Sequence, residues 1–207
     1  IRLLLAVSTL VVVWAFIEGL SSVLKAPWLK GIKIGLLGFG LGTNLLLFAQ
    51  WFTDPITVAL LATLIPISAT ILEVWDGRRK LNSRFILGLF ASIIGGFIAV
   101  SENISIDLGW GVLMALGSGF CFMWASDKSV TRLSELSSIA RSSVTFTGAA
   151  VFTTISFAVF FTLGLIEIPT KLSSGQFLSL IIYSVIAMAI SQVFFIAAID
   201  KVGIAIT

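Results

Sequence analysis

The sequence contains no histidine, a single cysteine and few charged residues. Without histidine, and with no ligand-like spacing of acids or cysteines, it offers no metal site, and no cofactor is predicted. Cys121 lies inside an apolar segment, so a disulfide framework is excluded. Only isolated serines and acids at segment ends remain, and no base is paired with a nucleophile. The sequence therefore predicts no catalytic residue and disfavours an intramembrane enzyme.

Charge is scarce because apolar residues dominate the chain of 207 residues. Hydrophobic residues make up 58% and charged residues 11%, whereas soluble domains carry about 25% charged residues. The mean hydropathy is +1.12. The net charge of +3 comes from bases in short connections, which membrane topology explains without nucleic acid. We therefore expect an integral membrane protein whose surroundings are a lipid bilayer and which binds no nucleic acid.

Seven apolar segments follow one another, and most have about the 20 residues that a helix needs to cross a bilayer. They are longer than the strands of a membrane barrel and lack strict alternation. The sequence thus predicts an all-α polytopic membrane protein with about seven transmembrane helices, and an eighth segment begins at Val202. The seven segments are 3–24, 33–52, 56–75, 85–101, 108–126, 143–165 and 177–199.

Basic residues occupy alternate connections between these segments. The other set of connections holds only Lys171, together with Arg2 if the first segment begins there. Short loops rich in Lys and Arg stay on the cytoplasmic side, so we predict a multi-pass protein of the inner (plasma) membrane with its basic loops in the cytoplasm. The basic set is Lys25, Lys30, Lys33, Arg78, Arg79, Lys80, Arg84, Lys128, Arg132, Arg141 and Lys201.

An internal repeat appears when the chain is shifted by 148 positions. Residues 43–59 then align with 191–207, so that Thr43 falls on Ser191 and Asn44 falls on Gln192. The two copies lie in the second and seventh segments, an odd number of spans apart, and would run in opposite directions. Inverted repeats are typical of secondary transporters, whose substrate site lies near the midplane where the repeats meet.

The segments also place polar groups, glycines and a proline at mid-depth, where a group facing lipid would be costly. We predict that these residues and two phenylalanines contact a transported solute in a central cavity. Three alternatives stay open: helix–helix hydrogen bonds for the polar groups, a simple kink at the proline, and ordinary packing for the aromatic residues. The candidates are Gly40, Thr43, Asn44, Phe48, Thr63, Pro66, Ser118, Ser191, Gln192 and Phe195.

Several loose motifs together resemble one family. They are GLLGFGLG at 35–42, ALLATLIP at 59–66, Gly88, DLGWG at 107–111, Ala125 and FFIAAIDKVG at 194–203. In these the chain resembles the EamA-like transporters of the drug/metabolite transporter superfamily. The family commonly has Glu after the glycine that follows the proline-bearing span, whereas Gly77 is followed here by Arg78.

The resemblance implies a ten-helix fold of two inverted five-helix repeats around a central cavity. Residues 1–104 would then be the first repeat without its first helix, and 105–207 the start of the second repeat without its last helices. The resemblance also implies export of metabolites or drugs. We expect a small, partly apolar solute, such as an amino acid or a drug-like compound, moved by alternating access through a monomer or dimer.

Coupling and alternative functions depend on where the charges lie. No carboxylate stands at mid-segment, where a proton relay would be expected, so we predict transport without strong proton coupling; Glu18 is the nearest exception. A nucleotide-sugar or sugar-phosphate carrier would need cavity bases, and no base lies at mid-segment. A seven-helix receptor matches the segment count, but the last segment lacks a mid-segment lysine for a retinal Schiff base.

Overall fold

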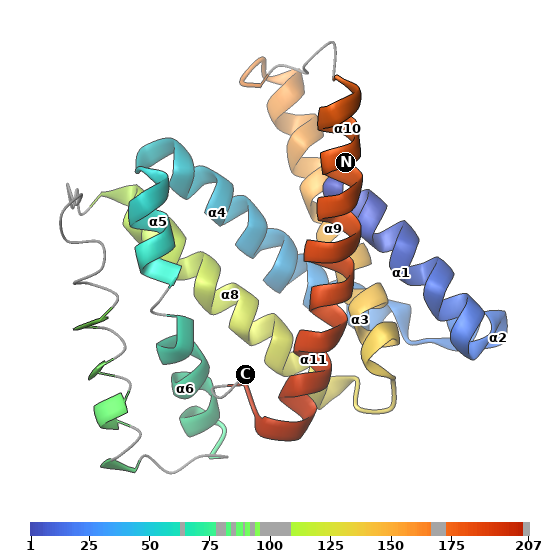
Figure 1. The fold of residues 1–207 in the computed structure, drawn as a ribbon, viewed down its shortest axis with the longest axis horizontal. Helices are drawn as coiled ribbons and strands as arrows, with labels where there is room; N and C mark the ends of the chain where they lie inside the picture. Colours follow the sequence, from blue (N-terminus) through green and yellow to red (C-terminus); the bar gives the residue numbers. More distant parts are fainter. Residues whose placement is uncertain are drawn as a thin grey trace.

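The computed structural model describes residues 1–62, 65–77, 82–83, 86–88, 90–91, 94–95, 109–166 and 173–204, and the regular elements in these ranges are helices (Figure 1). This confirms the predicted all-α fold. The helices are α1 (Arg2–Glu18), α2 (Leu20–Lys25), α3 (Trp28–Ile34), η1 (Gly35–Gly40), α4 (Leu41–Phe52), α5 (Pro55–Ala62), α6 (Ile65–Trp75), α8 (Trp110–Arg132), α9 (Ser138–Thr162), α10 (Ser174–Ile182), η3 (Tyr183–Ile190) and α11 (Ser191–Val202).

Four helical stretches in the described part of the chain are long and apolar enough to cross a membrane. They are Trp28–Phe52, Pro55–Trp75, Ser138–Thr162 and Ser174–Val202, and they correspond to predicted segments 33–52, 56–75, 143–165 and 177–199. Helix α8 adds 23 residues over the predicted segment 108–126. Most of the predicted segment 85–101 lies outside the described residues. The structure therefore confirms a polytopic arrangement of apolar helices.

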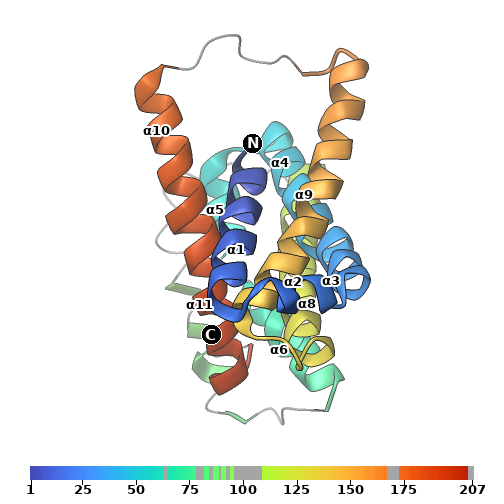
Figure 2. The same ribbon diagram turned by 90° about the vertical axis from the view of Figure 1, so that its right-hand side faces the viewer.

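The predicted segment 3–24 is not one helix, and this expectation was wrong. Helix α1 ends at Glu18 after 17 residues, because Gly19 has a φ of +83°. Only glycine adopts this conformation readily. Figure 2 shows α2 turning away from α1 and crossing the lower end of the bundle. A separate short helix, α2, therefore replaces the last part of the predicted span.

The glycines of the second span allow two backbones to touch. The stretch formed by α3 and η1 packs along α9. A Cβ on Gly35 would overlap the carbonyl oxygen of Thr145, and a Cβ on Gly148 would overlap that of Ile32. Small residues permit this close approach in lipid, where dispersion forces and interhelical hydrogen bonds drive helix association. This contact explains the glycine-rich motif at 35–42 as packing.

The turn between α4 and α5, the last turn of α9 and the start of α10 lie at the end of the bundle that carries the N-terminus (Figures 1 and 2). Helix α2, the beginning of α9 and the end of α11 lie at the opposite end (Figures 1 and 2). The described basic connections therefore gather at one end, which we call the basic end. Its assignment to the cytoplasm stays a prediction.

Two π-helical segments occupy equivalent places in the repeat. Segment η1 begins at Gly35 and continues into α4, while η3 begins at Tyr183 and continues into α11. The shift of 148 positions that aligns Thr43 with Ser191 also aligns these two starting residues. In Figure 1 the helix that contains η1 rises from the basic end, and the helix that contains η3 descends toward it. The two copies of the repeat thus run in opposite directions and share an unusual backbone feature.

Candidate functional site

A cavity of about 500 Å³ lies among the helices of both parts of the repeat. This size falls within the range of about 300–1,000 Å³ that is usual for small-molecule sites. Its polar wall residues are Arg2, Thr43, Gln50, Ser126, Ser191 and Gln192. Its aromatic and apolar wall residues are Leu3, Phe39, Leu46, Leu47, Ile65, Phe122, Met123, Phe146, Tyr183, Ala187, Met188 and Phe195.

The two π-helical segments and the helices that follow them form much of this wall. Segment η1 contributes Phe39, and η3 contributes Tyr183 and Met188. The next helical turns contribute Thr43 from α4 and Gln192 from α11. π-Helical turns widen a helix locally and occur often at functional sites. The cavity therefore lies between the two helices that contain the aligned segments.

Four of the predicted site residues line the cavity: Thr43, Ser191, Gln192 and Phe195. Ser191 Oγ donates a hydrogen bond of 2.5 Å to the Ala187 carbonyl of its own helix, so it can offer only an acceptor to a solute. Gln192 Nε2 is buried and has no hydrogen-bond partner among the described residues. Gln192 is thus a wall residue with an unused donor.

Asn44 was predicted to mirror Gln192 across the cavity, but the structure places it elsewhere. Its buried Nδ2 donates to the Gly40 carbonyl at 2.9 Å and lies 3.4 Å from Thr153 Oγ1 of α9. Neighbouring side chains on a helix point about 100° apart, so Thr43 faces the cavity while Asn44 faces α9. Gly40 also faces α9, because a Cβ there would meet the side chain of Phe152. Asn44 therefore makes a helix–helix hydrogen bond, which was the alternative to contact with a solute.

Phe48 and Ser118 are not among the described residues that line this cavity. The ring of Phe48 lies 5.4 Å from that of Trp51 and 5.2 Å from that of Phe160, in an aromatic cluster between α4 and α9. Ser118 is buried within α8. Its Oγ has no hydrogen-bond partner in the described part of the chain.

Two further candidates can be placed only in part or not at all. Thr63 lies outside the described residues. Pro66 belongs to α6, with helical backbone, and its side chain is not described. Whether either contacts a solute stays a prediction.

No sequence pattern singled out Gln50 or Arg2 as a site residue, yet both line the cavity. Gln50 stands seven residues after Thr43, with Leu46 and Leu47 between them, and this is the spacing of one helical face. Arg2 stood out only as an exception to the distribution of bases. Its Cζ lies 5.4 Å from the centre of the Tyr183 ring, which joins α1 to η3 at the end of the cavity away from the basic end.

Polar contacts tie the helices together at the basic end. Arg141 is buried at the start of α9. Its Nη1 donates to Asp200 Oδ2 of α11 at 2.6 Å. Its Nε and Nη2 donate to the carbonyls of Leu133 and Ser134 at 2.9 and 3.1 Å. One guanidinium therefore holds the α8–α9 turn against α11.

Two further contacts act at the same end. Glu18 accepts hydrogen bonds from Ser137 at the start of α9, from Trp14 and from Ser22 of α2. Lys128 Nζ of α8 lies 3.1 Å from Asp76 Oδ2, which follows α6, and 3.0 Å from Asp127 Oδ2. Together with Arg141, these contacts join α1, α6, α8, α9 and α11 below the cavity.

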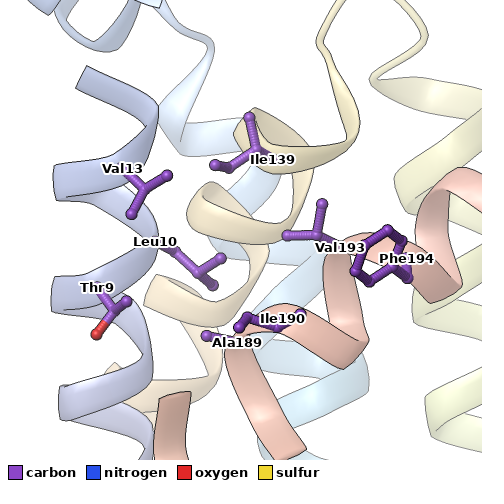
Figure 3. A pocket seen from close by; sticks show the side chains of 8 residues that line it. All are labelled: Thr9, Leu10, Val13, Ile139, Ala189, Ile190, Val193 and Phe194. Atoms are coloured by element: carbon purple, nitrogen blue, oxygen red, sulfur yellow. The ribbon is translucent and has the colours of Figure 1, made fainter. Parts of the chain in front are cut away.

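A second pocket, of about 190 Å³, lies between α1, α9 and the η3–α11 helix (Figure 3). Thr9 is the one polar side chain among the described residues of its wall, and its Oγ1 donates to the Leu5 carbonyl of its own helix at 2.9 Å. The other lining residues are Leu10, Val13, Ile139, Ala189, Ile190, Val193 and Phe194. This pocket has no free donor to orient a solute, so the larger cavity is the candidate site.

The described residues thus form a polytopic helical membrane protein with a mainly apolar cavity that carries a few polar side chains. Comparison with known families agrees with this class: the model of the EamA-like transporter family matches residues 1–101. The match confirms the resemblance seen in the sequence and indicates a membrane transporter of the drug/metabolite superfamily. No curated protein and no solved structure matched the chain in the corresponding comparisons.

Proposed function

We propose that this protein exports small, partly apolar metabolites, such as amino acids or drug-like compounds, through the central cavity by alternating access. The observation that carries the proposal is the composition of the cavity wall. Four phenylalanines (Phe39, Phe122, Phe146 and Phe195) provide an apolar surface, while amides and hydroxyls can orient a polar group. Such a mixture is usual for small-molecule sites. No catalytic role is proposed for this cavity.

The described conformation supports one state of an alternating-access cycle. The cavity wall reaches Arg2, Gln50 and Tyr183 at the end opposite the basic end. The contacts of Glu18 and Arg141 hold the helices together at the basic end. With the basic end in the cytoplasm, as the charge distribution favours, this is a state closed toward the cytoplasm. We further propose that this membrane is the inner (plasma) membrane.

The repeat supplies two places where the helices can bend. Segments η1 and η3 occupy equivalent positions, and both adjoin the cavity. Motion of one copy of the repeat against the other about a fixed site is the usual form of alternating access in inverted-repeat transporters. We propose that residues 1–104 and 105–207 form these two moving parts.

The charges around the cavity support transport without strong proton coupling. In the described part of the chain, no carboxylate lines the cavity, and Glu18 is engaged at the basic end. Arg2 is the one base on the described wall. A nucleotide-sugar or sugar-phosphate carrier would need several bases for its phosphate oxygens, so this alternative is less well supported.

Efflux from proteoliposomes tests the proposal. Purified protein is reconstituted into vesicles preloaded with radiolabelled amino acids or fluorescent drug-like dyes, and efflux is compared with that from protein-free vesicles. We expect saturable efflux of at least one of these solutes. Thr43→Val should slow it by altering the wall, whereas Thr147→Val is the matched control, because Thr147 Oγ1 bonds the Ser143 carbonyl of its own helix. Equal efflux from Thr43→Val and wild type would contradict the site, and no efflux of any solute would contradict the function.

A further inference from the structure

We propose that the cavity selects solutes that combine an apolar body with a carboxylate, and that Arg2 and Gln192 are the residues that determine this specificity. Arg2 would bind the carboxylate, and Gln192 would donate a hydrogen bond to another acceptor of the solute. This inference rests on the proposed function and adds to it the chemical class of the solute.

The charge of the wall is the first argument. Arg2 carries the one charge among the described lining residues, and no acidic side chain accompanies it there. Arg2 is solvent-exposed where it lines the cavity, and the wall beside it consists mainly of aromatic and aliphatic side chains, which screen its charge less than bulk water does. A carboxylate entering this cavity is attracted, whereas an ammonium group meets a like charge.

The position of the guanidinium is the second argument. The Cζ of Arg2 lies 5.4 Å from the centre of the Tyr183 ring, a cation–π arrangement that favours a position of the guanidinium beside the cavity wall. Among the described residues no hydrogen bond or ion pair engages its N–H groups. The planar fork of arginine matches the two oxygens of a carboxylate. The ring contact thus orients Arg2 and leaves its donors available.

The third argument is the unused amide of Gln192. Its Nε2 is buried without a hydrogen-bond partner in the described part of the chain, and a buried donor left unpaired is unfavourable. The nearby hydroxyls differ, since Ser126 and Ser191 donate to the Phe122 and Ala187 carbonyls of their own helices. Gln192 can therefore provide a donor where the serines offer acceptors.

A matched pair of compounds tests the inference. Radiolabelled phenylpropionate and phenylpropionamide share size and apolar body and differ in the carboxylate. Their binding to the purified protein is measured by scintillation proximity. We expect the wild type to bind the carboxylate about tenfold more tightly than the amide, as one charge-assisted hydrogen-bonded contact would give.

Three variants and one control show which residues cause the preference for the carboxylate. Arg2→Gln should lower the affinity for the carboxylate about tenfold and leave the affinity for the amide nearly unchanged, and Arg2→Lys should retain part of the preference. Gln192→Leu should weaken the binding of both compounds. Lys25→Gln, which removes a base in α2 away from the cavity wall, is the control and should leave both affinities unchanged.

The outcomes separate this inference from the proposed function. Equal binding of the two compounds by the wild type would overturn the inference, as would an Arg2→Gln variant that loses both equally. If vesicle efflux of neutral solutes is still observed in either case, the transport function stands and only the solute class is wrong. If no solute is transported, the proposed function itself is wrong.

Discussion

Arg141 of α9 and Asp200 of α11 form an ion pair of 2.6 Å at the basic end of the helical bundle. The pair joins the α8–α9 turn to the helix that carries Gln192, because Arg141 also bonds the carbonyls of Leu133 and Ser134. Its two members differ in burial: the side chain of Arg141 is 6% exposed, and that of Asp200 is 37% exposed.

This difference predicts unequal effects of substitution. Arg141→Met should lower the free energy of unfolding by about 3 kcal/mol, because it leaves two carbonyls without their donors and Asp200 without its partner. Asp200→Asn should cost less, about 1 kcal/mol, since the Asn carbonyl oxygen can still accept a hydrogen bond from Arg141 and the guanidinium keeps its two carbonyl acceptors. Thermal unfolding in detergent measures both, with Lys201→Gln as the control. Equal destabilisation by the two variants would contradict the greater contribution that we assign to the buried Arg141.

The contact between η1 and α9 leaves no room for a side chain at Gly35. Gly35→Ala should destabilise the protein by about 1–3 kcal/mol, because its Cβ would overlap the Thr145 backbone. Gly175→Ala is the matched control, since a Cβ at Gly175 in α10 would meet nothing within 4 Å. The melting temperatures of the two variants, compared with that of the wild type, measure this loss of stability. A Gly35→Ala protein that melts with the wild type would show that the two helices are farther apart.

Adjacent residues in α4 should respond in opposite ways. Asn44→Ala should lower stability by about 1 kcal/mol by removing the hydrogen bonds to Gly40 and Thr153. It should leave the solute preference unchanged. Thr43→Val should change transport with little loss of stability. Melting temperatures and efflux rates for a panel of solutes test this. A changed solute preference in Asn44→Ala would indicate that Asn44 contacts the solute.

Asp54 predicts a dependence of stability on pH. The hydrogen bonds from the Thr57 side chain and backbone, joined by that of Ile56, hold the pKa of Asp54 below its ordinary value of 3.8. A lowered folded-state pKa means that the stabilising contribution is present above 3.8 and is lost as the pH falls through the lowered pKa. Comparing acid unfolding of the wild type and Asp54→Asn tests this. If both lose stability equally below about pH 4, the carboxylate makes no contribution.

Efflux should not follow an imposed pH gradient, because no carboxylate lines the described cavity wall. Glu18→Gln should retain transport for the same reason, although it weakens the contact with Ser137. Efflux measured with and without a gradient, for the wild type and this variant, tests both statements. Transport that stops in Glu18→Gln, or that tracks the gradient, would contradict uncoupled export.

The helical spans were predictable because their lengths and apolar composition match the thickness of a bilayer. The break at Gly19 was missed because the residues on both sides of it are apolar enough to continue a span. Its signal was local: a glycine directly after Glu18, at the end of a segment, where a positive φ can stop a helix.

The site was only partly predictable, because the sequence marks polar residues without showing which way they face. Thr43 and Asn44 are neighbours with similar chemistry, and only the packing of η1 and α4 on α9 shows that the amide turns away from the cavity. Arg141 lay in the basic set, where topology explained it. Its buried contacts with Leu133, Ser134 and Asp200 depend on the tertiary arrangement and have no signature in the spacing.

The π-helical segments also affect which side chains a solute meets. One residue corresponds to about 100° of rotation around an α-helix. A π turn that reverted to α-helical hydrogen bonding would therefore turn the rest of its helix by about the angle between neighbouring side chains. In α4 the neighbour of Thr43 is Asn44, and in α11 the neighbour of Ser191 is Gln192. In α4, where Thr43 lines the cavity and Asn44 faces α9, such a change would bring an amide to the wall in place of a hydroxyl. In α11, where Ser191 and Gln192 both line the cavity, it would change which of the two faces the solute.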